Sequence, residues 1–244
     1  MRYHKGFTLI ELMLSMAFVS ILLISIAMLS IQLSNQYSRG LTLKEVTQAG
    51  TEASNDIKRT MAQAQISTTG VRLKQVLNGG WALCTGSYTY IANSPGNLEA
   101  NNANVIRVGE GANKSPARLA KVRDLGGAFC SATSNLDTVA GKNVDATDAS
   151  ELLSGGSRLL VVRDLTISPN TATGKPDLGQ PFYDDFQKGR GIYAVTITIG
   201  TGVDSEIQSN TTCKPPGSAD KLANLDFCAI DTFEFTTRVG SSEV

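Results

Sequence analysis

The chain has 244 residues, enough for one large domain or for a long helix followed by one domain. Its 22 basic and 22 acidic residues balance, so no global field favours nucleic acid or an anionic membrane surface as a partner. The single histidine, His4, precedes a long apolar run, and no other histidine follows. The rest of the chain therefore excludes Ser-His-Asp and Cys-His nucleophilic sites and every His-ligated metal site. We expect no cofactor and no bound metal.

The apolar run covers residues 7–33 and is long enough to span a bilayer as one helix. Arg2 and Lys5 precede it and would stay cytoplasmic under the positive-inside rule. An ordinary secretory signal has a shorter apolar core and a small-residue cleavage site after it, and no convincing site follows here. A plain signal anchor leaves Glu11 unexplained, because a charge at membrane depth costs at least ~2.5–3.5 kcal/mol.

The sequence GFTLIE at residues 6–11 resembles the leader junction of type IV prepilins and of type II secretion pseudopilins. The match combines a short basic leader, Gly6, Phe7, Glu11 as the fifth residue after the cut, and the apolar run. The resemblance implies a leader at residues 1–6, which a prepilin peptidase removes between Gly6 and Phe7. The same enzyme methylates the new N-terminus of Phe7 in this family.

For Glu11, the resemblance implies that the carboxylate of an incoming subunit meets the N-terminal amine of a neighbour in the filament core. Pairing two groups that are each costly in an apolar setting lowers the cost of both and sets the axial register. The alternative is that Glu11 only snorkels to the membrane interface near the helix end.

Beyond the run, residues 34–66 continue the helical pattern in amphipathic form and enter a globular domain. Gly40 and Gly50 weaken this helix by roughly 1 kcal/mol each relative to Ala, so a bend is expected there. No proline lies within residues 1–70 to break the helix. The apolar residues that recur close to one face are Tyr37, Leu41, Val46, Ala49, Ala53, Ile57, Met61 and Ala64.

Residues 67–244 read as an extracytoplasmic, β-rich domain. The strands come in a run after the helix, which favours antiparallel pairing and an α+β architecture in which the amphipathic helix packs on the sheet. Two long loops are expected at residues 109–156 and 168–190. The expected strands are Trp81–Ala92, Asn104–Val108, Arg158–Leu165, Gly191–Ile199 and Ile230–Val239.

Two charged clusters stand out in and just before the first expected loop. The basic one has no interleaved aromatic residue to stack on bases, so a solvated face is favoured over a nucleic-acid site. The acidic one fits no EF-hand spacing, which argues against a calcium site. The basic residues are Arg107, Lys114, Arg118, Lys121 and Arg123, and the acidic ones are Asp137, Asp145, Asp148 and Glu151.

The four cysteines, Cys84, Cys130, Cys213 and Cys228, all follow the apolar run and form no CxxC pair. Their even number in an exported domain predicts two disulfides. Three connectivities are open, and we favour the sequential pairing because it closes the shortest loops. The second of these pairs also resembles in position the disulfide-closed C-terminal region of many type IV pilins.

These features indicate a structural, non-catalytic subunit of a type IV pilus-like filament. The last expected strand is loosely similar to that of PilW-type minor pilins, which favours a minor pilin. A major pilin or a type II secretion pseudopilin is the alternative, and a membrane-anchored extracytoplasmic binding domain is a further one. The resemblance implies three partners: other pilin subunits bound through the helix, the prepilin peptidase and methyltransferase, and the pilus assembly platform. It places the precursor in the bacterial inner membrane and the mature chain in the filament.

Overall fold

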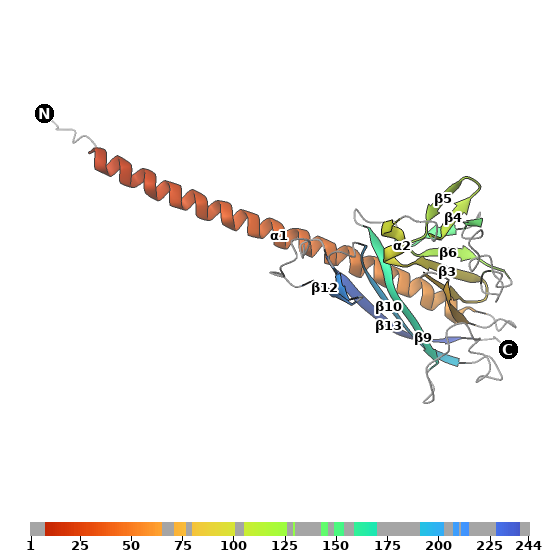
Figure 1. Ribbon diagram of the computed structural model, residues 1–244. Helices are drawn as coiled ribbons and strands as arrows, with labels where there is room; N and C mark the ends of the chain where they lie inside the picture. Colours follow the sequence, from red (N-terminus) through yellow and green to blue (C-terminus); the bar gives the residue numbers. More distant parts are fainter. Residues whose placement is uncertain are drawn as a thin grey trace.

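The computed structural model describes residues 8–64, 71–76, 80–100, 105–125, 129, 143–145, 149–153, 159–169, 191–202, 207–209, 211–214 and 228–239. Figure 1 shows a long helix, α1, that projects from a β-rich domain and carries the N-terminal end of the chain far from it. The expected α+β fold with a long N-terminal helix is confirmed. The two ends of α1 therefore have different surroundings.

Helix α1 runs from Leu9 to Ala62 without interruption and has 54 residues. At ~1.5 Å per residue its length is roughly 80 Å. The helix begins after Thr8, which adopts an extended conformation and caps the first turn, and Gln63 is its C-cap. The absence of proline allows its hydrogen-bond ladder to continue through the expected bend positions.

The buried face of α1 begins later than the sequence pattern predicts. Tyr37 is 70% exposed and Leu41 is 41% exposed, so the prediction that these two belong to the buried face is wrong. The domain reaches along the helix only as far as Thr42, and apolar residues before that point have nothing to pack against. From there on the buried residues are Thr42, Val46, Gly50, Ala53, Ser54, Ile57, Thr60 and Met61.

The first sheet has five strands in the order β1-β2-β3-β6-β8, and all its pairs are antiparallel. The single strand expected at Trp81–Ala92 is wrong, because a tight turn splits that segment into β2 and β3. Gly86 has φ of 93° in this turn, a conformation that residues with a side chain rarely adopt. The strands are β1 (Arg72–Val76), β2 (Gly80–Cys84), β3 (Tyr88–Asn93), β6 (Ala120–Arg123) and β8 (Ala149–Glu151).

The second sheet has the order β13-β10-β9 and is also antiparallel. Its strands are β9 (Leu160–Pro169), β10 (Gly191–Thr201) and β13 (Ile230–Val239). The three strands expected in this part of the chain are therefore confirmed, and β13 has the expected bounds. Their β-branched and aromatic residues at alternating positions suit a half-buried sheet.

The prediction of a loop at residues 109–156 is wrong in the part of this segment that the structure describes, because that part contains four short strands. Two of them, β6 and β8, join the first sheet. The other two, β5 (Asn113–Pro116) and β7 (Asn143–Asp145), form a small third sheet with β4 (Arg107–Glu110) in the order β5-β4-β7. These strands have only three or four residues each, too few for an alternating pattern to identify them in the sequence. Residues 170–190 of the second expected loop lie outside the described residues.

The remaining elements are short. Strand β4 starts three residues later than the strand expected at Asn104–Val108. These elements are β4 (Arg107–Glu110), β5 (Asn113–Pro116), β7 (Asn143–Asp145), β11 (Ile207–Ser209), β12 (Thr212–Cys213) and helix α2 (Pro95–Ala100).

The main core lies between the C-terminal half of α1 and the inner faces of the two larger sheets. It joins α1 to strands from both ends of the domain sequence, so the helix is part of the domain rather than a separate stalk. Its largest fully buried members are Tyr90, Ile57, Met61, Leu73, Leu83, Leu119, Leu153 and Leu160.

Candidate functional site

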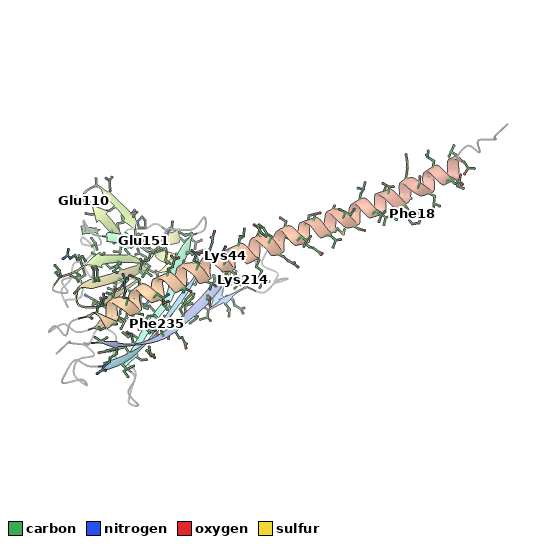
Figure 2. All side chains as sticks on the ribbon, turned by 180° about the vertical axis from the view of Figure 1, so that it is seen from behind. Phe18, Lys44, Glu110, Glu151, Lys214 and Phe235 are labelled. Atoms are coloured by element: carbon green, nitrogen blue, oxygen red, sulfur yellow. A yellow bond between two sulfur atoms is a disulfide. The ribbon has the colours of Figure 1, made fainter. Side chains whose placement is uncertain are left out.

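The N-terminal half of α1 is a continuous apolar surface that touches no other described part of the chain. Leu9 is 78% exposed, and the large apolar side chains from there to Leu33 are all at least half exposed. Figure 2 shows these side chains on all sides of the helix, Phe18 among them. Among the described residues, α1 is the one helix long and apolar enough to cross a membrane. Such a surface needs lipid or other apolar helices around it.

The serines of this segment do not interrupt the apolar surface. Ser20 donates its hydroxyl to the carbonyl of Met16 at 2.8 Å, one turn back along the same helix. Three further serines make the same kind of bond to their own helix, which satisfies the hydroxyl without an outside partner. These are Ser15, Ser25 and Ser30.

Glu11 has a partner inside its own chain. Its carboxylate accepts from the backbone N–H of Thr8 at 3.0 Å and from the Thr8 hydroxyl at 2.8 Å. The Thr8 side chain accepts in turn from the backbone N–H of Glu11 at 3.4 Å. This reciprocal capping box satisfies N–H groups at the helix start, and the negative charge lies at the positive end of the helix dipole.

The capping box gives Glu11 a role within one subunit that neither interpretation of the sequence included. The pattern Thr8 to Glu11, with an apolar run after it, is the sequence signature of such a cap and could have revealed it. Gly6 and Phe7 lie outside the described residues, so cleavage and methylation there remain predictions. Pairing of Glu11 with a neighbouring amine also remains a prediction.

The contact between α1 and β13 depends on Gly50. The ring of Phe233 lies so close to the backbone of Gly50 that a Cβ at this position would overlap it. Thr47 donates to the carboxylate of Asp231 at 3.2 Å one turn before this contact. Strand β13 therefore runs along α1 in the same direction. From the sequence alone, Gly50 is only a weak point of the helix, because the residue that it contacts, Phe233, lies far away in the sequence.

A second contact joins the last turns of α1 to the first sheet. Asp56 accepts from Lys121 Nζ at 2.9 Å and from the Tyr90 hydroxyl at 2.9 Å. The Lys121 ammonium also lies over the rings of Tyr88 and Tyr90, at 4.6 and 5.8 Å from their centroids. Thr60 Oγ1 lies 2.7 Å from the Tyr90 hydroxyl. Burial raises the pKa of Tyr90 well above its usual range, so this hydroxyl stays protonated.

The structure changes the interpretation of the basic cluster. Its members lie on or beside strands rather than in a loop, and Lys121 is largely buried in an ion pair with Asp56. A side chain held in this way is not available to bind phosphate.

In the acidic cluster, only Glu151 has a described side chain. Its carboxylate accepts from the backbone N–H groups of Arg118 at 2.9 Å and of Leu119 at 2.7 Å. Asp137 and Asp148 lie outside the described residues. Within the described part of the chain, no three His, Cys, Asp or Glu side chains gather as metal ligands would.

The C-terminal part of the domain is closed by a disulfide between Cys213 and Cys228, fifteen residues apart, as the sequence analysis expects. Cys84 is also disulfide-bonded. Cys130 lies outside the described residues, so the pairing of Cys84 with Cys130 remains a prediction.

Comparison with known proteins bears on the N-terminus. Residues 1–31 match the family model of the prokaryotic N-terminal methylation motif. Searches of curated proteins and of solved structures found no significant match. The matched residues include the leader junction, the capping box and most of the exposed apolar surface of α1. The methylation motif and the exposed apolar helix together support a type IV pilin-like or pseudopilin subunit that associates with a membrane.

Proposed function

We propose that this chain is a minor pilin, a non-catalytic subunit that takes part in the assembly, priming or adhesion of a type IV pilus-like filament. The observation that carries the proposal is α1 itself. A membrane anchor needs only about 20 apolar residues. Here the helix continues past its exposed apolar half, and its second half packs into the domain. A filament subunit needs this arrangement, because it fixes the position of the domain relative to the helix that contacts neighbouring subunits.

Before assembly, the exposed half of α1 resides in the bacterial inner membrane. In the filament, the same surface packs against the helices of neighbouring subunits in an apolar core. This exchange replaces lipid contacts with helix contacts, so it needs no change in the fold of the domain. The prepilin peptidase and methyltransferase and the pilus assembly platform are the partners that this route requires.

The minor role is supported by the size of the domain and by the four short strands that it adds to the first and third sheets. Such additions suit a subunit that need not repeat along the whole fibre. A major pilin or a type II secretion pseudopilin is the second candidate, because the methylation motif and the exposed helix are equally compatible with both.

The test is to follow processing and filament incorporation of the full chain in its host. Intact-mass analysis of the filament-borne protein should show loss of residues 1–6 and gain of one methyl group on Phe7. Replacing Gly6 by a bulky residue should leave the precursor in the membrane. Assembled protein that retains Met1 would contradict the proposal. The number of copies per filament then separates a minor from a major subunit.

A further inference from the structure

A groove of about 330 Å³ lies between α1 and the free edge of β13. Four consecutive residues of β13, 232–235, line its strand side, and Figure 2 labels Phe235 among them. Consecutive side chains point to opposite faces of a strand, so a groove lined by all four follows the edge of the strand. β13 is the last strand of its sheet, and no described strand pairs with this edge. An unpaired strand edge is a template for another strand.

The helix side of the groove contains a buried polar group without a partner. Ser54 is only 8% exposed, and its hydroxyl finds no hydrogen-bond partner among the described residues. On the same helix, Thr51 donates its hydroxyl to the carbonyl of Thr47 at 2.7 Å, which is the usual solution for a hydroxyl within a helix. A buried hydroxyl without a partner costs free energy, so an occupant of the groove that supplies one is favoured.

The rest of the lining suits an extended polypeptide. Asn55, next to Ser54, is exposed and offers both a donor and an acceptor to a main chain. Phe233 and Phe235 are half-buried and pack against the core, so they offer an apolar surface to a side chain. Main-chain hydrogen bonds to a sheet edge, together with contacts for alternate side chains, are how proteins bind an added strand.

β13 also carries a charge pattern. Glu234 and Arg238 are exposed, and neither forms an ion pair with another described residue. They are four residues apart, so their side chains lie on the same face of the strand. Opposite charges directly across a strand pair are favourable. A matching strand therefore carries a basic residue opposite Glu234 and an acidic residue opposite Arg238.

β13 of a second copy of this chain would match this pattern only in the antiparallel direction, in which each strand places its arginine opposite the glutamate of the other. Paired in parallel, the two strands would match at most one of the two charges. However, β13 runs in the same direction as α1, because its contacts advance from Thr47–Asp231 to Gly50–Phe233. Antiparallel pairing would therefore point the two α1 helices in opposite directions, whereas subunits inserted in one membrane share one direction. A second copy is therefore a poor fit for this edge.

We propose that the groove between α1 and β13 receives an extended strand from a different subunit of the same filament. The strand adds to the free edge of β13, and its main chain provides the hydrogen-bond partner of Ser54. Two of its charged residues pair with Glu234 and Arg238. This inference rests on the proposed minor role, because a contact with a different subunit need not repeat along the fibre.

The experiment uses the full chain in a bacterial inner membrane, co-expressed with a prepilin peptidase and, in turn, with each other protein of its host that carries an N-terminal methylation motif. A photo-cross-linking amino acid, benzoylphenylalanine, replaces Asn55 in the groove. The control variant carries it at the exposed Thr166 of β9, the other outer strand of the same sheet. We expect a product with one of these partners from position 55 and none from position 166. Peptide mapping should place the cross-link on a partner strand that has a basic and an acidic residue four positions apart.

Two substitutions separate the groove contact from effects on the fold. Ser54→Ala should lower the cross-link yield about fivefold, as the loss of one hydrogen bond does. It should not lower the midpoint of urea unfolding, because the hydroxyl that it removes has no partner among the described residues. Glu234→Lys should lower the yield about threefold, in line with an exposed ion pair, and charge reversal of the mapped basic residue of the partner should restore it. Glu110→Lys on β4, outside the groove, is the matched control and should leave the yield unchanged.

Cross-linking to a second copy of this chain, to none of the co-expressed partners, or equally from position 166 would overturn the inference. So would a partner with reversed charge that fails to recover the yield, or an unfolding midpoint that falls with Ser54→Ala. If the cross-link is absent while processing and filament incorporation are normal, the groove contact fails and the filament function stands. Loss of processing in the unmodified chain would instead contradict the filament function itself.

Discussion

The ring of Phe233 on β13 occupies the space beside the backbone of Gly50 that a side chain would fill on any other residue. This contact brings the edge strand of the second sheet against the helix at closer range than larger residues allow. It joins the helix that carries the exposed apolar surface to β13, the last strand described in the domain.

Gly50→Ala should destabilise the domain, because the new methyl group meets the Phe233 ring and the packed contact must shift. Overpacking of this kind typically costs about 1–3 kcal/mol. Urea unfolding of the full chain in detergent measures the change. Gly40→Ala is the matched control, since a Cβ there meets nothing within 4 Å. That variant should gain roughly 0.5–1 kcal/mol from helix propensity. Equal effects at both positions would contradict the close contact.

Glu11→Gln tests the carboxylate separately from the cap. Glutamine can still accept from the backbone N–H of Thr8, so the helix start, membrane insertion and cleavage should be kept. Filament incorporation should fall, because the N-terminal amine of a neighbour loses its counter-charge in an apolar core. Sheared filament fractions, compared at equal mature protein in the membrane, provide the measurement.

Glu11→Ala completes that comparison, because it removes both the charge and the capping interaction. If the Gln variant assembles normally and only the Ala variant fails, the capping box accounts for the residue and the pairing hypothesis is wrong. Normal assembly of both variants would support the snorkelling alternative.

Because of Tyr90, the stability of the domain should depend on pH in the alkaline range. Burial raises its pKa, while a tyrosine in the unfolded chain titrates near ~10. The folded state therefore holds the proton after the unfolded state has lost it. The resulting stability is fully present below pH ~10 and falls above it by up to ~1.4 kcal/mol per pH unit. Urea unfolding between pH 9 and 11 should show this slope.

Tyr90→Phe should reduce the pH dependence of the free energy of unfolding by the contribution of one titrating group. At neutral pH it should also lower the free energy of unfolding by about 1–3 kcal/mol, because the hydrogen bonds of the hydroxyl are lost. Tyr193, whose pKa burial also raises, should maintain the rest of the slope. Tyr37→Phe is the control, since this side chain is 70% exposed and should leave both quantities unchanged. A slope unaffected by Tyr90→Phe would show that this hydroxyl does not stay buried.

Replacing Cys213 and Cys228 together by serine should lower the free energy of unfolding by ~3 kcal/mol, the chain-entropy value for a loop of this length. Unfolding of the oxidised wild type beside the double variant measures the difference. Alkylation without reduction should label neither cysteine in native wild-type protein. Free labelling of both would contradict the bridge and an exported domain.

The sequence by itself determined the N-terminal half of α1. A continuous apolar run without proline, a Thr-x-x-Glu cap and a basic leader are local signals, and the helix that they specify needs no distant partner. The apolar run predicted a helix long enough to span a membrane, and the cap, which neither interpretation of the sequence used, marks where that helix starts. These local signals also pointed to the methylation motif. The long strands of the second sheet were predictable for the same reason, since their alternation is visible within about ten residues.

Only the tertiary structure decided which residues of the helix are covered and what they meet. Tyr37 and Leu41 fit the apolar periodicity as well as the buried positions do, but the domain does not reach them. Asp56 forms an ion pair with Lys121, which lies 65 residues away in the sequence. Gly50 contacts Phe233, which lies still farther away in the sequence. Pairings at such separations depend on how the whole chain packs, and periodicity within one segment carries no information about them.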